Sequence, residues 1–275
     1  MAGKRKIRWD RLALLLAPFV IIIALICTKC GGSPGNPEEN SRPKATIEGS
    51  LPAQTGQNGT DNVQQSERSC TVVIDAGHGG NDGGCTDLDG KRLEKDDNLR
   101  LSLLVRDYLL KYPGVNVIMT RTEDVFVGLE ERCRIANEAK ADLFVSLHRN
   151  AASNASGVEI WINSASNNKN SAVEHSLAGH IRELLTDVGV SYDRGIRSGF
   201  RNSENGSKED NYYVNRNTDM PSCLIEMGFM TSDIDNTNFD RRLDAYADAI
   251  ASAIIETAED TNLNAPEETT AEAAS

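Results

Sequence analysis

The stretch TVVIDAGHGG, residues 71–80, carries a run of apolar β-forming residues into a histidine surrounded by glycines. Val72 to Ile74 predict a short buried strand, and the glycines that follow predict a sharp turn with backbone conformations closed to other residues. His78 is therefore expected at the carboxyl end of a strand. In open α/β sheets, ligands commonly bind at that edge.

Strand and helix patterns alternate through the rest of residues 70–258. After the glycine-rich turn, Leu101, Leu104 and Val105 lie at helical spacing, with Asp96 or Asp97 as the expected N-cap. Further strands are predicted in GVNVIMT (114–120), DLFVSLH (142–148), GVEIWIN (157–163) and SCLIEMGF (222–229), and further helices in LEERCRIANEAK (129–140), SAVEHSLAGHIRELLTD (171–187) and from about Asn238. This order predicts a single α/β domain with a twisted, mostly parallel (mixed) sheet and helices on both faces.

The segments outside this domain differ from it in composition. Residues 1–11 are strongly basic, residues 12–28 are almost wholly apolar, and residues 29–69 are rich in Gly, Ser, Pro, Asn and Gln. We expect a basic cytoplasmic flank, a membrane anchor and a flexible linker, which would hold the folded domain outside the cytoplasm at the cell membrane. The apolar run has a length between those of a signal-peptide core and a spanning helix, so secretion after signal-peptide cleavage is the alternative. Residues 259–275 are expected to form a disordered acidic tail.

Charge and cysteine content exclude some classes of protein. The net charge of −12 argues against binding to nucleic acid. The six cysteines show no zinc-finger spacing. Cys70 and Cys85 flank the opening motif and can either form a disulfide outside the cytoplasm or remain thiols, whereas Cys133 and Cys223 fall in helix and strand patterns typical of buried thiols.

Polar residues end three of the predicted strands. His78 and His148 follow two apolar runs, and Glu226 lies in a third. Two imidazoles and one carboxylate leave a fourth position open on a tetrahedral zinc ion, which suits hydrolysis. Glu94 begins the helix after the glycine-rich turn, and spacing alone leaves it open between a ligand and a solvated helix start. His175 and His180 lie five residues apart in a helix and are expected at the surface.

Four separated stretches resemble, in the same order, the motifs of a known family. They are VVIDAGHGGNDGG, EKDDN, RCRIANEAKADLFVSLHRNA and VNRNTDMPSCLIEMGFMTS. Together they resemble the zinc-dependent N-acetylmuramoyl-L-alanine amidases, the amidase-3 group of peptidoglycan hydrolases. The resemblance covers about residues 71–257 and implies a twisted mixed sheet flanked by helices.

The resemblance implies roles for individual residues. It implies that His78, Glu94 and His148 bind one Zn²⁺ per chain and that Glu226 is the catalytic carboxylate. The implied reaction is hydrolysis of the amide bond between the lactyl group of N-acetylmuramic acid and the L-alanine of peptidoglycan stem peptides, with Glu226 as base and then acid. The alternatives are another zinc hydrolase of the cell wall, such as a peptidase or deacetylase, and a non-catalytic wall-binding or regulatory protein.

Two weaker implications concern the substrate and its access. Arg216 and Asn217, in RNT, resemble a segment near the family's active site and are expected to contact substrate. Arg149 departs from the small residue that many family members have after the second histidine, and is expected to alter substrate contacts. Some members insert a helix after this motif that blocks the metal. The segment here is short, so we expect no internal plug, with control by an unidentified protein activator as the alternative.

Overall fold

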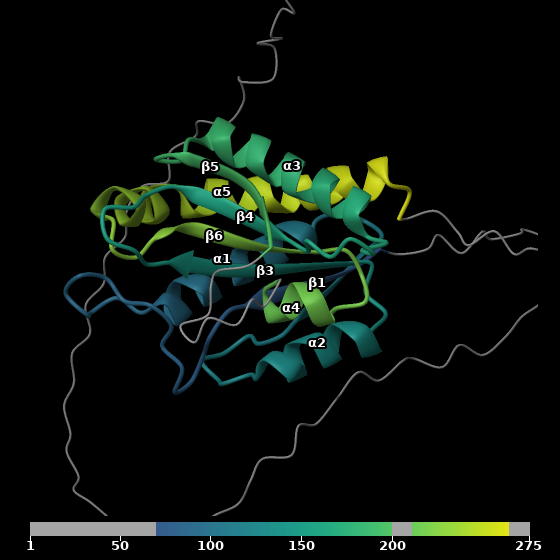
Figure 1. Ribbon diagram of the computed structural model, residues 1–275, viewed down its shortest axis with the longest axis horizontal. Helices are drawn as coiled ribbons and strands as arrows, with labels where there is room; N and C mark the ends of the chain where they lie inside the picture. Colours follow the sequence, from purple (N-terminus) through teal and green to yellow (C-terminus); the bar gives the residue numbers. More distant parts are fainter. Residues whose placement is uncertain (1–69, 200–210, 264–275) are drawn as a thin grey trace, which may run out of the picture. The chain divides into compact units, whose positions relative to one another are not determined.

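The computed structural model describes residues 70–199 and 211–263 of the chain. Within them, six strands form one sheet in the order β2-β1-β3-β6-β4-β5 (Figure 1). The strands are β1 (Cys70–Ala76), β2 (Val115–Met119), β3 (Leu143–Asn150), β4 (Val158–Ile162), β5 (Asp193–Ser198) and β6 (Ser222–Phe229). Neighbouring strands are parallel except β4 and β6, which pair antiparallel.

Helices cover both faces of this sheet. They are α1 (Glu94–Leu109), α2 (Leu129–Glu138), α3 (Ser171–Val188), α4 (Tyr213–Asn217) and α5 (Asp233–Asp260). Helices α1, α3 and α5 pack on one face, and the shorter α2 and α4 lie on the other (Figure 1). The predicted α/β fold, a mostly parallel mixed sheet between two layers of helices, is confirmed.

The two faces of the sheet differ in how apolar they are. Ile74 and Leu147 belong to a large apolar cluster with Leu101 and the other residues that α1, α3 and α5 contribute. Val73 and Phe144, which alternate with them along the strands, belong to a smaller cluster on the side of α2 and α4. This smaller cluster leaves room for polar groups beside it.

Strand order decides which polar residues meet. β1, β3 and β6 are parallel neighbours, so their carboxyl ends lie at the same edge of the sheet. His148 on β3 is paired in register with Glu226 on β6. The backbone N–H of Gly77, just after β1, donates to the carbonyl oxygen of Leu147 at 3.1 Å. The glycine-rich turn is thereby held against the end of β3.

Strand β5 and helix α4 were not predicted from the sequence. The β5 segment, DRGIRS, has no apolar alternation, so a sequence pattern does not reveal it. Its partner β4 stabilises it: Arg194 and Arg197 each place Nε 3.0 Å from Oε2 of the buried Glu159. Ile196 is paired with Ile160 in the same register. The α4 helix has five residues, too few for a periodic signal.

Three predicted helix boundaries were wrong by a few residues. Neither Asp96 nor Asp97 is the N-cap of α1, because the helix begins at Glu94 and both lie in its first turn. Helix α5 begins at Asp233 instead of about Asn238, and its N-cap is the Ser232 side chain, which accepts a hydrogen bond from the N–H of Asp235. The same helix continues to Asp260, two residues into the segment that we predicted as a tail.

The predicted flank, anchor and linker, residues 1–69, lie outside the described residues, as do residues 264–275 of the predicted tail. Among the residues that are described, none of the helices is both long and apolar enough to span a membrane. Within the same residues no disulfide joins Cys70 to Cys85, and Cys133 and Cys223 are buried thiols as predicted.

A buried ion pair ties α2 to the end of β1. Arg132 and Asp75 have side chains 3% and 1% exposed, and Nη1 of Arg132 lies 2.5 Å from Oδ1 of Asp75. The hydroxyls of Thr120 and Ser146 donate to the same carboxylate at 2.7 Å. Burial alone would raise the pKa of Asp75, but Arg132 and these hydroxyls hold it below its usual range. Removing one partner would leave the other charge buried and uncompensated.

We therefore expect Arg132→Met to lower the free energy of unfolding by about 3–5 kcal/mol, measured by denaturant unfolding. Arg134→Met is the matched control on the same helix. Arg134 pairs only with the exposed Glu131 and Glu138 among the ion pairs found, and because exposed ion pairs contribute little, its loss should have a much smaller effect. Equal effects of the two substitutions would contradict this role of the Asp75 pair.

Candidate active site

Two histidines and one glutamate meet at the carboxyl edge of the sheet. Nε2 of His78 lies 3.2 Å from Oε2 of Glu94, and Nδ1 of His148 lies 3.0 Å from Oε1 of the same carboxylate. The two imidazole rings meet edge to face, with centroids 5.0 Å apart. The three residues come from the turn after β1, the first residue of α1 and β3. The structure thus brings together the three predicted ligands.

Glu94 is the buried centre of this group. It is 1% exposed, and its carboxylate also accepts hydrogen bonds from the backbone N–H groups of Cys85, at 2.8 Å, and Arg149, at 3.0 Å. Burial raises the pKa of Glu94, but hydrogen bonds and charge from His148 and His78 outweigh burial and hold it far below its usual range. Glu94 is therefore an ionised carboxylate directed at both imidazoles. The alternative of a solvated helix start does not describe it.

His78 is held from its other ring nitrogen by a residue that sequence analysis did not assign. Nδ1 of His78 lies 2.8 Å from Oδ2 of Asp82, four residues along the same turn. Burial lowers the pKa of His78, but Glu94 and then Asp82 outweigh it and raise the pKa to about 9. Metal-binding histidines usually bond a carboxylate or carbonyl through the second nitrogen. The NDGG segment that contains Asp82 was the only signal available in the sequence.

Two glycines make this close approach possible. A Cβ at Gly77 would lie 2.3 Å from Cε1 of His148, and a Cβ at Gly84 would lie 2.6 Å from Oε2 of Glu94. Neither contact is sterically permitted. His78 itself has φ of 59°, in the left-handed region that residues other than glycine rarely adopt. The turn therefore holds a strained backbone to aim its imidazole.

The donor set fits a zinc ion. One ligand atom from each of His78, Glu94 and His148 lies within 4.8 Å of the other two. Ligands of a tetrahedral zinc ion at about 2.0–2.1 Å are separated from one another by roughly 3.3 Å, close to the nitrogen–oxygen distances found here. The second nitrogen of His78 has its carboxylate partner, as in known zinc sites.

Glu226 lies next to the three residues on the same face of the sheet. It is 6% exposed, its strand position is paired with that of His148, and the hydroxyl of Tyr212 lies 3.5 Å from its Oε1. Side chains at paired positions of neighbouring strands project from the same face. The predicted catalytic carboxylate is thus beside the predicted ligands and not among the three that approach one another.

These residues line a cavity of about 830 Å³. Its polar floor contains His78, Glu94, His148 and Glu226. Its walls are formed by residues that sequence analysis did not identify: Phe126, Val127, Gly128 and Leu129 before α2, and Tyr212, Tyr213 and Val214 at the start of α4. Phe126 and Leu129 are 58% and 50% exposed. A cavity with apolar walls and a few polar groups at one end is typical of a ligand site.

Arg216 and Asn217 contact Tyr213, which lines the cavity, and the side chain of Arg149 points away from the cavity. Arg216 is exposed on α4 with its guanidinium over the ring of Tyr213, and Asn217 donates to the Tyr213 carbonyl oxygen; neither is among the described residues that line the cavity. The Arg149 side chain is fully buried on the opposite face of the sheet, between α1 and α5. Arg149 is among the residues that line the cavity, but alternation along β3 directs its side chain away from His148, so the guanidinium does not contact a molecule bound there.

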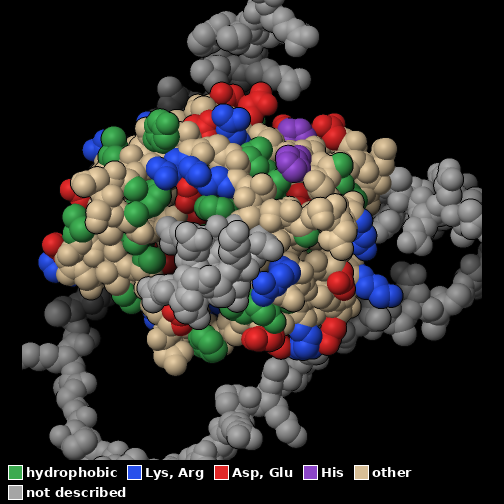
Figure 2. Space-filling view, viewed as in Figure 1, with side chains coloured by type: hydrophobic (Ala, Val, Ile, Leu, Met, Phe, Trp, Pro, Cys, Tyr) green, Lys and Arg blue, Asp and Glu red, His purple; other side chains and the backbone are tan. Residues whose placement is uncertain are grey.

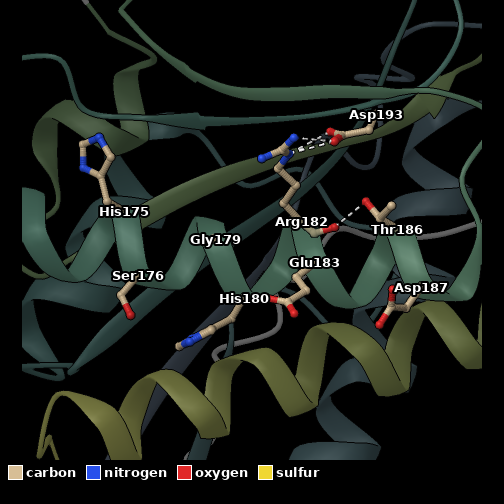
Figure 3. A pocket seen from close by; sticks show the side chains of 9 residues that line it. All are labelled: His175, Ser176, Gly179, His180, Arg182, Glu183, Thr186, Asp187 and Asp193. Carbon is tan, nitrogen blue, oxygen red and sulfur yellow. Dashed lines mark hydrogen bonds and ion pairs between the residues drawn. The ribbon is translucent and has the colours of Figure 1, made fainter. Parts of the chain in front are cut away.

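A second hollow, of about 570 Å³, lies on the outer side of α3 and holds the other two histidines (Figure 3). His175 and His180 point to different sides of the helix (Figure 3). Nδ1 of His175 lies 2.7 Å from the carbonyl oxygen of Ser171, and Nδ1 of His180 lies 2.9 Å from the hydroxyl of Thr257. His175 is at the surface as predicted, whereas His180 is partly buried.

On the face shown in Figure 2, basic and acidic side chains are interspersed.

Several solved structures that resemble this one are amidases. The structure of the N-acetylmuramoyl-L-alanine amidase from Clostridium difficile 630 is 31% identical and superposes with a TM-score of 0.60 over 70% of this chain and 98% of that one. The catalytic domain of CwlV, an amidase from Bacillus (Paenibacillus) polymyxa var. colistinus, is 32% identical with a TM-score of 0.58, covering 69% and 98%. The CwlD amidase from Clostridioides difficile, solved in complex with the GerS lipoprotein, is 27% identical with a TM-score of 0.55, covering 71% and 99%.

Sequence relatives agree with the structures. The uncharacterised protein YqiI of Bacillus subtilis (strain 168) is 39% identical over 67% of this chain and 82% of its own length. The probable cell wall amidase LytH of Staphylococcus epidermidis is 31% identical over 68% of this chain, but the match spans only 56% of LytH. Residues 72–256 match the family model described as N-acetylmuramoyl-L-alanine amidase. With the motifs, the fold and the polar cluster in agreement, the chain belongs to the N-acetylmuramoyl-L-alanine amidase family of peptidoglycan hydrolases.

Proposed function

We propose that this protein hydrolyses the amide bond between the lactyl group of N-acetylmuramic acid and the L-alanine of peptidoglycan stem peptides, with one zinc ion held by His78, Glu94 and His148. The observation that carries the proposal is the convergence of two imidazoles on one buried carboxylate, beside Glu226, at the floor of the cavity. The family supplies the class of reaction. The convergence of these side chains supports the assignment of the residues.

The chain's own groups prepare the site for a cation. A bound zinc ion would polarise the carbonyl group of the scissile amide and lower the pKa of a water molecule at its open position. Glu94 and Asp82 hold the two nitrogens of His78 in fixed directions, with Asp82 on Nδ1 and Glu94 on Nε2. Because these carboxylates raise the pKa of His78 to about 9, metal binding near neutral pH has to displace a proton from this imidazole.

Glu226 is suited to proton transfer. Its carboxylate is mostly buried at the cavity floor, close to but separate from the three converging ligand atoms. In the reaction it accepts a proton from the attacking water and donates it to the leaving amine of L-alanine. With three protein ligands, a catalytic zinc site keeps one position open, and a fourth ligand from Glu226 would close it.

The described residues contain no helix between β3 and β4. Residues 151–157 join β3 to β4 without a helix, in agreement with the expectation that no plug is inserted there. We propose that the enzyme needs no internal segment to be moved before substrate binds. Dependence of the purified protein on an added protein for zinc binding and activity would instead identify an activator.

We further propose that residues 12–28 anchor the protein in the cell membrane and that the catalytic domain acts outside the cytoplasm. A substrate in the cell wall requires an extracytoplasmic domain. The basic residues 1–11 before the apolar run favour the orientation in which the amino terminus stays inside.

Two substitutions separate proton transfer from metal binding. Glu226→Gln removes the base but keeps the size of the side chain, so it should retain near-stoichiometric zinc and lose roughly 10²-fold or more in turnover. His148→Ala, which removes a ligand, should lose both zinc and activity. Metal content and muropeptide release are measured on the same preparations, and mass analysis of the products identifies the bond cleaved. A Glu226→Gln protein without zinc would make Glu226 a ligand, and a fully active one would exclude it from the mechanism.

A second prediction concerns Asp82. Asp82→Asn removes the charge that orients His78, and it should weaken zinc affinity by roughly 10–100-fold, as measured by competition with a chelator. Asp107→Asn is the control, because Asp107 is similarly exposed and pairs only with Arg106 among the ion pairs found. Unchanged zinc affinity in the Asp82 variant would remove it from the site.

The third prediction concerns topology. In intact protoplasts, added protease should remove the catalytic domain and leave the amino-terminal segment with the membrane. Release of the domain into the medium without protease would support cleavage of a signal peptide. Complete protection of the domain would show that the orientation is wrong.

A further inference from the structure

Arg149 has no role in the reaction described above, although it follows His148 directly in the chain. Its side chain is 0% exposed, and a buried guanidinium is costly unless its charge and its N–H groups are all satisfied. An apolar side chain of similar volume would fill the same space without that cost. The hydrogen bonds and the ion pair of Arg149 therefore indicate which parts of the fold it holds in place.

Three bonds of Arg149 lead to the elements that carry Glu94 and Glu226. Nη1 is paired with Asp97, one helical turn after Glu94 on α1. Nε donates at 3.0 Å to the carbonyl oxygen of Met227, the residue after Glu226 on β6. The backbone N–H of Arg149 donates at 3.0 Å to the Glu94 carboxylate itself.

Arg149 also bonds to a third element, α5. Nη2 donates at 2.8 Å to Oδ1 of Asn236 on α5, and the guanidinium lies 4.5 Å from the centre of the Phe239 ring. The planar guanidinium has fixed donor directions, so it sets the positions of several groups at once, which a lysine ammonium does not. Arg149 thus links α1, β6 and α5 from the carboxyl end of β3.

We propose that Arg149 is a positioning residue that holds the carboxylates of Glu94 and Glu226 at fixed places on either side of His148. Its side chain acts from the face of the sheet opposite the cavity. It positions Glu94 through its ion pair with Asp97 on α1, and Glu226 through its hydrogen bond to the β6 backbone. The inference rests on the proposed zinc site.

The chain contains a matched control for this role. Arg92 also pairs with Asp97, at 2.6 Å, and its guanidinium also lies over Phe239, at 5.4 Å. Its other ion pair is with Asp240 on α5, and no hydrogen bond found in the described residues joins its side chain to β3 or β6. Arg92→Met and Arg149→Met thus each remove an arginine from the same aspartate and ring, and in each variant the other arginine still pairs with Asp97.

The test compares Arg149→Met, Arg149→Lys and Arg92→Met in the full-length protein. We measure zinc affinity by chelator competition, the absorption spectrum of the cobalt-substituted protein, kcat and KM on muropeptides, and thermal unfolding. Arg149→Met should bind zinc roughly 10–100-fold more weakly, with an altered cobalt spectrum and a lower kcat. Arg92→Met should lose thermal stability, but its zinc affinity should stay within about two-fold of the wild-type value. The absorption spectrum of its cobalt-substituted form should match that of the wild type.

Arg149→Lys decides the matter if Arg149→Met does not fold. Lysine keeps the charge opposite Asp97 but does not reach Met227 and Asn236 together. It should therefore keep zinc affinity within a few-fold and lose about 10-fold in kcat at similar KM. Wild-type kcat in Arg149→Lys, or zinc affinity and spectrum in Arg149→Met equal to those of Arg92→Met, would overturn the inference. A wild-type protein that binds no zinc would refute the proposed function instead.

Discussion

The burial of one negative charge, on Glu94, organises the site and the elements around it. A carboxylate that is 1% exposed is tolerated only when donors surround it. Its donors come from two segments of the chain: His78 and the N–H of Cys85 from the turn after β1, and His148 with the N–H of Arg149 from β3. The turn, the start of α1 and the end of β3 therefore have one mutual arrangement that satisfies the charge.

Arginines support this arrangement from both faces of the sheet. On the side of the cavity, Arg132 pairs with Asp75 and donates to the carbonyl oxygens of Ala76 and His78, which fixes the backbone on both sides of the glycine at 77. On the opposite side, Arg149 links α1 to β6. Buried ion pairs of this kind contribute little net stability, but they are costly to break, which favours a single geometry over alternatives. That property suits the proposed zinc site, in which three ligand atoms would have to stay within a few ångströms of one another.

The same region combines a strained backbone with a close group of charges. His78 has a positive φ, and its pKa is raised to about 9 by Glu94 and Asp82 in the absence of a cation. Such strain persists where the surrounding contacts over-determine the conformation. A cation at this position would relieve the concentration of carboxylates that the fold assembles. Catalysis and stability therefore have partly opposed requirements at the end of β1.

The sequence by itself determined the main elements and most of the site. Apolar runs ending in His78, His148 and Glu226 were sufficient to predict three parallel strands and a shared polar edge, because strand periodicity is a local property of the chain. Local pattern does not report pairing partners, so β5, which depends on ion pairs with Glu159, was missed. Only the tertiary structure decided that Glu94 is buried, that Arg149 lies on the face opposite the cavity, and that the segments before α2 and at α4 form the cavity walls. The physical reason is that the direction and burial of these side chains depend on which distant segments pack beside them.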